Sequence, residues 1–193
     1  WDGTSTLIGA RTPVYISGMT FVGTVGSNMR FHLGSSGNNV TAIIAPVNQD
    51  DTLGNSKVFA RTSTNNGTTW GDVTTIFAPF TENAGQDTIA SSGGSGFTYK
   101  PGTSNWYYAY VTSADGLFAS AKLKMRKSDG STVVLTDAAT VGATSSFNKA
   151  MAFVFSIDFP ALGWSADGST MYCVYSVVMP DTGASGFNQR DIF

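Results

Sequence analysis

The fold of this chain is decided by the apolar stretch Trp106-Tyr107-Tyr108-Ala109-Tyr110-Val111, which is one of three runs of the same kind. The other two are Val40–Ala45 (VTAIIA) and Met171–Ser176 (MYCVYS). The runs begin at positions 40, 106 and 171, so they are spaced by 66 and 65 residues. None alternates cleanly between apolar and polar residues, and this pattern is typical of β-strands that are covered on both faces. We therefore expect one strand to recur three times in a repeated architecture.

Other landmarks keep the same phase along the chain. Nine residues before each run lies an apolar anchor, a second anchor follows two residues later, and a polar turn with a glycine separates the anchors from the run. The first anchors are Phe31, Phe97 and Leu162, the second anchors are Leu33, Tyr99 and Trp164, and the turn glycines are Gly37, Gly102 and Gly168. This arrangement predicts a strand, a tight turn and a second strand in each repeat.

Composition favours an all-β protein. The 193 residues include 22 glycines and many Thr, Val, Phe and Tyr, whereas Glu82 is the one glutamate. With 41% hydrophobic residues the chain can build a sizeable core. We expect four strands in each repeat, which in the middle repeat lie at about 95–100, 105–112, 117–126 and 132–136. The stretches 78–95 and 138–158 are expected to be connecting loops.

The most specific motif is Ser63–Trp70, which reads STNNGTTW. A short Asn side chain can bond the N–H groups of its own turn, Gly tolerates positive φ, and Trp covers the hairpin with apolar surface. The motif resembles the Asp box, S-x-D-x-G-x-T-W, of the sialidase-like, BNR-repeat β-propellers. Residue 65 is Asn where the box prefers Asp, and Arg126–Val133 is a degenerate second copy. The residues that carry the resemblance have a structural role there, and they are Ser63, Asn65, Gly67, Thr69 and Trp70.

This resemblance implies an all-β chain of about three consecutive four-stranded blades, with a period of about 65 residues, within a larger β-propeller. The approximate units are 1–70, 71–133 and 134–193 in a single-domain fragment. Trp1–Ile8 reads like Trp70–Phe77, so we expect the first residue to fall inside a repeat of a longer chain.

Loops on the face opposite the boxes are the expected recognition elements of such a propeller. These loops are 9–27, 46–56, 80–95, 113–117, 138–158 and 180–189. Charged residues in the loops, together with one arginine near the first strand, give the candidate binding residues. They are Arg11, Arg30, Glu82, Asp87 and Asp158.

Sialidases of this fold clamp a carboxylate with three arginines and use a Tyr–Glu nucleophile pair and an Asp acid. Such a set cannot be placed here: Ala10–Pro13 is faintly similar to the family's Arg-Ile-Pro element but lies too far before Phe31. Arg61 and Lys124 are expected at equivalent positions beside the boxes, which favours a repeated structural role. A single histidine, His32, supports no Ser/His/Asp triad. We assign no catalytic residue.

Metal, thiol and nucleic-acid chemistry find little support. Asn48, Asp50 and Asp51 could offer oxygen ligands to Ca²⁺, but their spacing fits no EF-hand, so we expect no metal or other cofactor. Cys173 falls in an apolar run, which indicates a core residue. The formal net charge is −2, and the basic cluster 122–127 indicates a solvated strand face, so no nucleic-acid partner is expected. No apolar run is long enough to span a membrane.

Two functional hypotheses stay open. The first is a non-catalytic, extracellular or cell-surface β-propeller that serves interaction, adhesion or assembly, with glycan binding included. Its partners would be a protein or glycan at the cell surface and the remaining blades of the parent chain. The alternative is a sialidase-type glycoside hydrolase with only part of its active site in this chain. Low charge and abundant Ser, Thr, Asn and Gly favour an extracellular protein.

Overall fold

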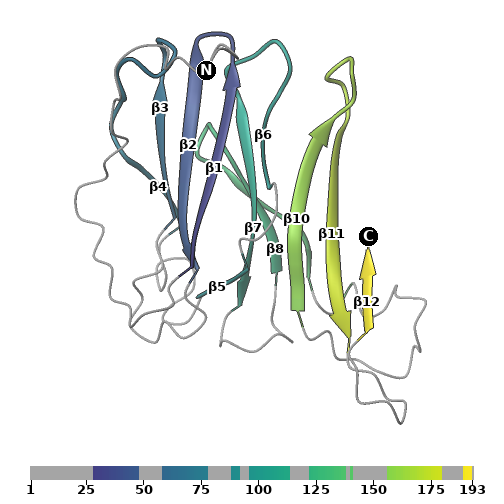
Figure 1. Ribbon diagram of the computed structural model, residues 1–193. Helices are drawn as coiled ribbons and strands as arrows, with labels where there is room; N and C mark the ends of the chain where they lie inside the picture. The colour runs from purple at the N-terminus through teal and green to yellow at the C-terminus, as the bar shows by residue number, and fades with distance from the viewer. Residues whose placement is uncertain are drawn as a thin grey trace, which may run out of the picture.

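The computed structural model describes residues 28–47, 58–77, 88–91, 96–113, 122–137, 140, 156–179 and 189–192. In this part of the chain the fold is all-β, with almost no helix, and all strand pairs are antiparallel. The strands form three separate sheets, which follow one another from left to right in Figure 1. Across the described residues, no helix combines the length and the apolar character needed to cross a membrane.

The first sheet is a four-stranded meander in the order β1-β2-β3-β4. Its strands are β1 (Asn28–Ser36), β2 (Asn39–Val47), β3 (Val58–Ser63) and β4 (Thr74–Phe77). Phe31 pairs with Ile44, which in turn pairs with Phe59. Gly37 joins β1 to β2 with a φ of 56°, a left-handed conformation that glycine adopts without strain.

The second sheet has the order β5-β7-β8-β9, and β6 also pairs with β7. Its strands are β5 (Thr88–Ser91), β6 (Phe97–Tyr99), β7 (Trp106–Ser113), β8 (Lys122–Lys127) and β9 (Thr132–Asp137). Both β5 and β6 pair with β7, with Thr88 opposite Ser113 and Tyr99 opposite Trp106. Together they take the place of the single long strand β1 of the first sheet.

The third sheet has the order β10-β11-β12. Its strands are β10 (Ser156–Trp164), β11 (Met171–Met179) and β12 (Gln189–Ile192). Strand β10 shifts its register against β11 between Asp158 and Ala161. Ser176 pairs with Ile192, so β12 is the counterpart of β3 in the first sheet.

All three sheets present equivalent positions in the same direction. Phe97 and Tyr99 of β6 pack toward the first sheet, in a core that includes Ile43, Val58 and Ala60. The large residues Trp106, Tyr108 and Tyr110 of β7 belong to that same core. The opposite side of the second sheet, with Ala109, Val111 and Leu123, packs against the third sheet. Strand β7 is therefore covered on both faces, as its lack of alternation predicts.

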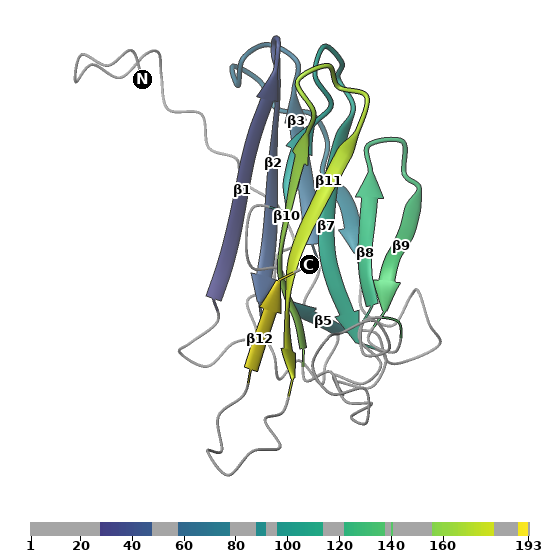
Figure 2. The same ribbon diagram turned by 90° about the vertical axis from the view of Figure 1, so that its right-hand side faces the viewer.

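The same orientation holds at the second interface. Leu162 packs with the Ala109–Leu123 core, and the Trp164 ring lies 5.2 Å from that of Tyr107, centroid to centroid, in an edge-on arrangement. Leu162 and Trp164 stand one repeat after Phe97 and Tyr99, so both pairs face the preceding sheet. The sheets are stacked head to tail rather than back to back. Figure 2, which looks onto the third sheet, shows the hairpins of successive sheets running in the same direction.

The predicted strands of the middle repeat are close to β6, β7, β8 and β9, and the three turn glycines all have positive φ. Three expectations are wrong. Residues 88–91 form β5 and residues 156–158 belong to β10, so neither stretch is loop. Lys124 is buried, because it lies opposite Tyr110 on the side of β8 that faces the first sheet, so the basic cluster is not a uniformly solvated face.

Candidate functional site

The described hairpin turns gather at one end of the molecule, which we call the turn end (Figures 1 and 2). It comprises the turns after β1, β3, β6, β8 and β10. Two hydrogen bonds tie neighbouring turns together: Asn66 N–H donates to Asn38 O at 2.9 Å, and Ser36 Oγ donates to Thr103 O at 2.6 Å. The second of these joins the first sheet to the second.

The turn Ser63–Trp70 is held by its own side chains. Ser63 Oγ accepts from the N–H of Gly67 at 2.8 Å and donates to Asn65 Oδ1 at 2.8 Å. Asn65 Oδ1 also accepts from Thr69 N–H at 2.9 Å, and Asn65 Nδ2 donates to Thr69 Oγ1 at 2.9 Å. Asn66 and Gly67 both have positive φ, 57° and 81°. The side-chain bonds satisfy backbone groups that no strand ladder reaches, and they fix the tip of the hairpin.

Arg61 closes the base of this hairpin. Its Nε donates to Gly71 O at 2.8 Å and its Nη2 donates to Trp70 O at 3.2 Å. The expected equivalence of Arg61 with Lys124 is wrong, because Arg61 lies opposite Ala42, and the counterpart of Ala42 in the second sheet, Tyr108, lies opposite Arg126. The turn between β8 and β9 is shorter than the turn between β3 and β4. Aligning the two repeats by their turns therefore matches Arg61 with Lys124, whereas the strand pairing matches it with Arg126.

Carboxylates take the place of Asn65 in two other turns. Asp129 Oδ1 accepts from Ser131 N–H at 2.8 Å and Ser131 Oγ at 2.7 Å, and these bonds lower the pKa of Asp129. In Ser165–Thr170, Asp167 Oδ1 accepts from the Ser165 hydroxyl and from Ser169 N–H. The Ser165 and Ser169 bonds lower the pKa of Asp167 to about 2, because they stabilise the charged form.

In this third turn the repeat pattern of the sequence marks only Gly168. The signal it missed is the Ser165-x-Asp167 spacing, which matches Ser63-x-Asn65. The match was overlooked because the turn joins β10 to β11, where the repeat places a simple tight turn rather than a box.

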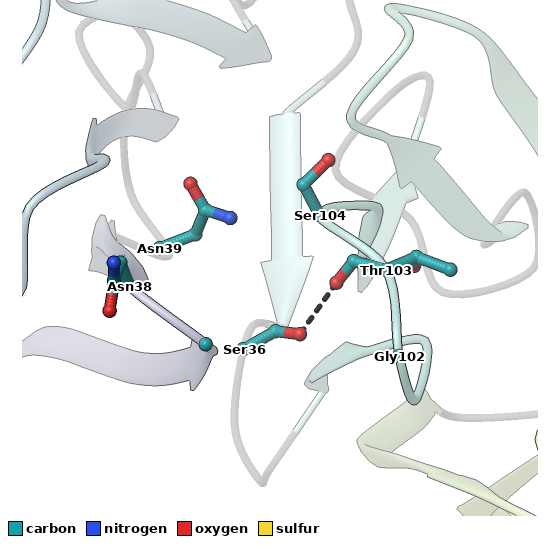
Figure 3. Close-up of a pocket in the computed structure, with 7 residues that line it drawn as sticks. Ser36, Asn38, Asn39, Gly102, Thr103 and Ser104 are labelled. Atoms are coloured by element: carbon teal, nitrogen blue, oxygen red, sulfur yellow. Dashed lines mark hydrogen bonds between the residues drawn. The ribbon is translucent and has the colours of Figure 1, made fainter.

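A polar cleft opens at the turn end between the first and second sheets (Figure 3). It is lined by Ser36, Gly37, Asn38 and Asn39 of the first sheet and by Gly102, Thr103 and Ser104 of the second. Hydroxyl, amide and backbone groups form this lining, with no ionisable side chain among them. Apart from the glycine and its two chain neighbours, no atom lies within 4 Å of the point where a Cβ on Gly37 or Gly102 would stand, so both glycines leave room for an approaching molecule.

The corresponding gap between the second and third sheets is filled instead. Pro101 packs on Gly168, with its Cβ 3.5 Å from the point where a Cβ on that glycine would stand. Lys100 Nζ lies 5.5 Å from the centroid of the Trp164 ring, within the range of a cation–π contact. The cleft is thus a property of the first gap and does not recur in the second.

Two of the five binding residues predicted from the sequence lie within the described part of the chain. Arg11, Glu82 and Asp87 lie outside the described residues. Arg30 is on β1 opposite Ala45. Asp158 is on β10 opposite Ser176, beside the register shift, and not in a loop as expected. Within the cleft lining the sequence pattern marks only Gly37 and Gly102, as turn glycines, because recognition loops are expected on the face opposite the Ser63–Trp70 motif.

His32 and Cys173, whose side chains can take part in catalysis or metal binding in other settings, both pack between sheets here. The His32 ring lies 5.4 Å from that of Tyr108, centroid to centroid, in an edge-on contact between the first and second sheets. Cys173 packs against the core between the second and third sheets, and burial raises the pKa of its thiol, so it is less reactive than an exposed cysteine. Among the residues that the structure describes, no three His, Cys, Asp or Glu side chains come together as a metal site would require.

No protein-family model matches the chain, and a search of the curated proteins gives no significant match.

Proposed function

We propose that this chain is part of a β-propeller that acts as a non-catalytic, extracellular or cell-surface interaction module. One observation carries the proposal: three antiparallel sheets of one repeat stack in the same orientation, with equivalent residues facing the preceding sheet. Sheets stacked in this way around an axis are the blades of a propeller. The hydrogen-bonded turn Ser63–Trp70 supports the same proposal, since it has the bonding that an Asp box requires.

The polar cleft is the best candidate for ligand contact within the described residues. Its lining offers donors and acceptors from Ser36, Asn39, Thr103 and Ser104 and no charged group. This chemistry suits a neutral, hydroxyl-rich ligand such as an oligosaccharide, which exchanges its bonds to water for bonds to hydroxyls and amides. A phosphate or carboxylate ligand would call for a cationic lining.

The proposal is tested by titrating the protein with neutral and sialylated oligosaccharides and following the amide resonances. We expect a neutral oligosaccharide to shift resonances of the Ser36–Asn39 and Gly102–Ser104 turns. The variant Ser104→Trp should weaken binding at least about tenfold, because a ring in the cleft excludes the ligand. Its matched control is Ala166→Trp, which adds the same ring to the exposed turn of the third sheet and should bind as the unmodified protein does.

Three results would each overturn one part of the proposed function. If no oligosaccharide binds, or if Ala166→Trp weakens binding as much as Ser104→Trp, the cleft is not a glycan site. If the protein hydrolyses a fluorogenic sialoside, the sialidase-type alternative replaces the non-catalytic assignment. The propeller itself fails if an experimental structure shows the sheets as the layers of a closed sandwich rather than as blades around an axis.

A further inference from the structure

The two end faces of the stack expose repeat residues whose counterparts pack between sheets elsewhere in the described chain. On the first sheet, Phe31 and Leu33 are 67% and 72% exposed. Their counterparts Phe97 and Tyr99, one repeat later, pack into the core between the first and second sheets. We call the surface that contains Phe31 and Leu33 the head face. It has the side chains of a buried inter-sheet surface, but no sheet among the described residues covers it.

At the other end of the stack, the third sheet exposes the residues that would contact a following sheet. On the third sheet, Tyr172 and Val174 are 59% and 47% exposed. Tyr172 stands one repeat after Tyr107, whose ring contacts Trp164 of the next sheet. Val174 likewise stands one repeat after Ala109, which is buried against the third sheet. We call the surface that contains Tyr172 and Val174 the tail face.

Both inter-sheet contacts within the chain join a tail-type surface to a head-type surface. Thr41 of the first sheet bonds the Tyr99 hydroxyl of the second at 2.6 Å, and Tyr107 of the second sheet meets Trp164 of the third. A third contact of this kind would place Tyr172 against Leu33, and Val174 near Phe31. The chain therefore holds both halves of an interface that it has already used twice.

We propose that the head face docks on the tail face of a second copy of this chain, so that the copies associate head to tail. The inference rests on the proposed propeller, in which each of these faces meets a neighbouring blade. The occupant is a copy because the described sheets of this chain already fit one another in this contact twice, and the proposed interface continues those two contacts. On each face two large apolar side chains are exposed two residues apart on a single strand, β1 or β11, and such surfaces favour burial. The contact is heterologous, so repetition leads either to a closed ring or to an open chain of copies.

Sedimentation velocity over a range of protein concentrations tests the proposal, with one blocked variant for each face. Leu33→Asp places a charge on the head face and Tyr172→Asp places one on the tail face. Both residues are exposed, so neither change should disturb the fold, and circular dichroism melts verify this. The unmodified protein should associate as its concentration rises, whereas each variant alone should remain monomeric.

Mixing the two variants gives the decisive result. Leu33→Asp retains an intact tail and Tyr172→Asp retains an intact head, so an equimolar mixture should form a one-to-one dimer that grows no further. Formation of this dimer also shows that both variants are folded. The control Val134→Asp alters an exposed apolar residue on β9, away from both faces, and should associate as the unmodified protein does.

Other outcomes contradict the proposal. A monomeric unmodified protein at every accessible concentration removes the interface. Self-association of one blocked variant alone indicates a face that pairs with itself. A mixture that stays monomeric, or loss of association in Val134→Asp, shows that the two faces are not the contact surfaces.

Discussion

The two inter-sheet interfaces occupy the same positions of the repeat but are filled in different ways. Between the first and second sheets the core is aromatic: the rings of Tyr108 and Tyr110 stack with centroids 5.8 Å apart. Between the second and third sheets the fully buried residues are aliphatic, among them Ala109, Val111 and Val177, and the aromatic pair Tyr107–Trp164 is only partly buried. The single strand β7 supplies two stacked tyrosines to the first interface, whereas Ala109 and Val111 fill the centre of the second. The repeat thus sets which backbone positions meet between sheets, whereas the size of the side chains at those positions differs from one interface to the other.

Glycine shows how this adjustment works. A Cβ on Gly34 of β1 would come closer to the Phe97 ring than van der Waals contact allows, so the missing side chain admits the ring. At the second interface, a Cβ on Gly96 would lie 2.6 Å from Ala109 O and 3.2 Å from Pro160 O. The first glycine makes room for a side chain, and the second makes room for a close approach of backbones.

The largest expected effect separates the two cores. Tyr108→Ala should lower the free energy of unfolding by about 4 kcal/mol, because it empties a large, fully buried site in the aromatic interface. Leu123→Ala in the aliphatic interface should lower it by about 3 kcal/mol. Denaturant unfolding at one fixed protein concentration measures both, since self-association contributes to stability. A larger loss for Leu123→Ala would reverse the assigned importance of the two interfaces.

A smaller effect tests the fit at Gly34. Gly34→Ala should destabilise the protein by about 2 kcal/mol, because the added methyl group displaces the Phe97 ring. Phe97→Leu shortens the side chain opposite, so the double variant should be more stable than the sum of the two single effects by about 1 kcal/mol. Simple additivity in this cycle would show that Gly34 and Phe97 do not compete for space.

The hydrogen bond across the first interface is expected to contribute less. Thr41→Val keeps the shape of the buried side chain and removes the hydroxyl that bonds the Tyr99 and Thr62 hydroxyls. The free energy of unfolding should fall by about 1.5 kcal/mol, because polar groups are left buried without this partner. Tyr99→Phe should add little to Thr41→Val in the double variant. If Tyr99→Phe lowers the free energy of unfolding equally in the unmodified protein and in Thr41→Val, the two hydroxyls do not stabilise the fold through a shared hydrogen bond.

The smallest effect contrasts the turns of the first and third sheets at low pH. The pKa of Asp167 is lowered to about 2 in the folded protein from the ordinary value of 3.8. The charged carboxylate therefore stabilises the fold above about pH 4, and this contribution is lost as the pH falls through the folded-state value of about 2. Asp167→Asn keeps an acceptor oxygen, as Asn65 does, and lacks this dependence.

Thermal melts between about pH 5 and pH 2 measure this difference. The melting temperature of Asp167→Asn should lie below that of the unmodified protein at the upper end, and the two should converge toward the lower end. Asp129→Asn serves as a comparison, because the pKa of Asp129 is also lowered by bonds from Ser131. A gap between unmodified protein and Asp167→Asn that does not change with pH would contradict the assigned role of the charge.

Much of the architecture could be predicted from the sequence because it is local. The runs beginning at residues 40, 106 and 171 became β2, β7 and β11, and the glycines between paired strands took the positive φ that a tight turn requires. Strand β5 was missed because Thr88–Ser91 is short and lies in a polar stretch, and it exists only through its pairing with β7. The cleft was missed for a similar reason, since its lining comes from two turns that are 63 or more residues apart along the chain.

What the sequence determined by itself is the repeat: its period, the strand that recurs, and the turns that bond to their own side chains. These follow from interactions between residues close together in the chain, which act in any tertiary context. Only the tertiary structure decided which face of each strand meets which sheet, so that Phe97 is partly buried against the core while its counterpart Phe31 is exposed. That choice depends on packing between residues far apart in the chain: the Phe97 ring fits against Gly34, and the aromatic side of β7 packs against the first sheet.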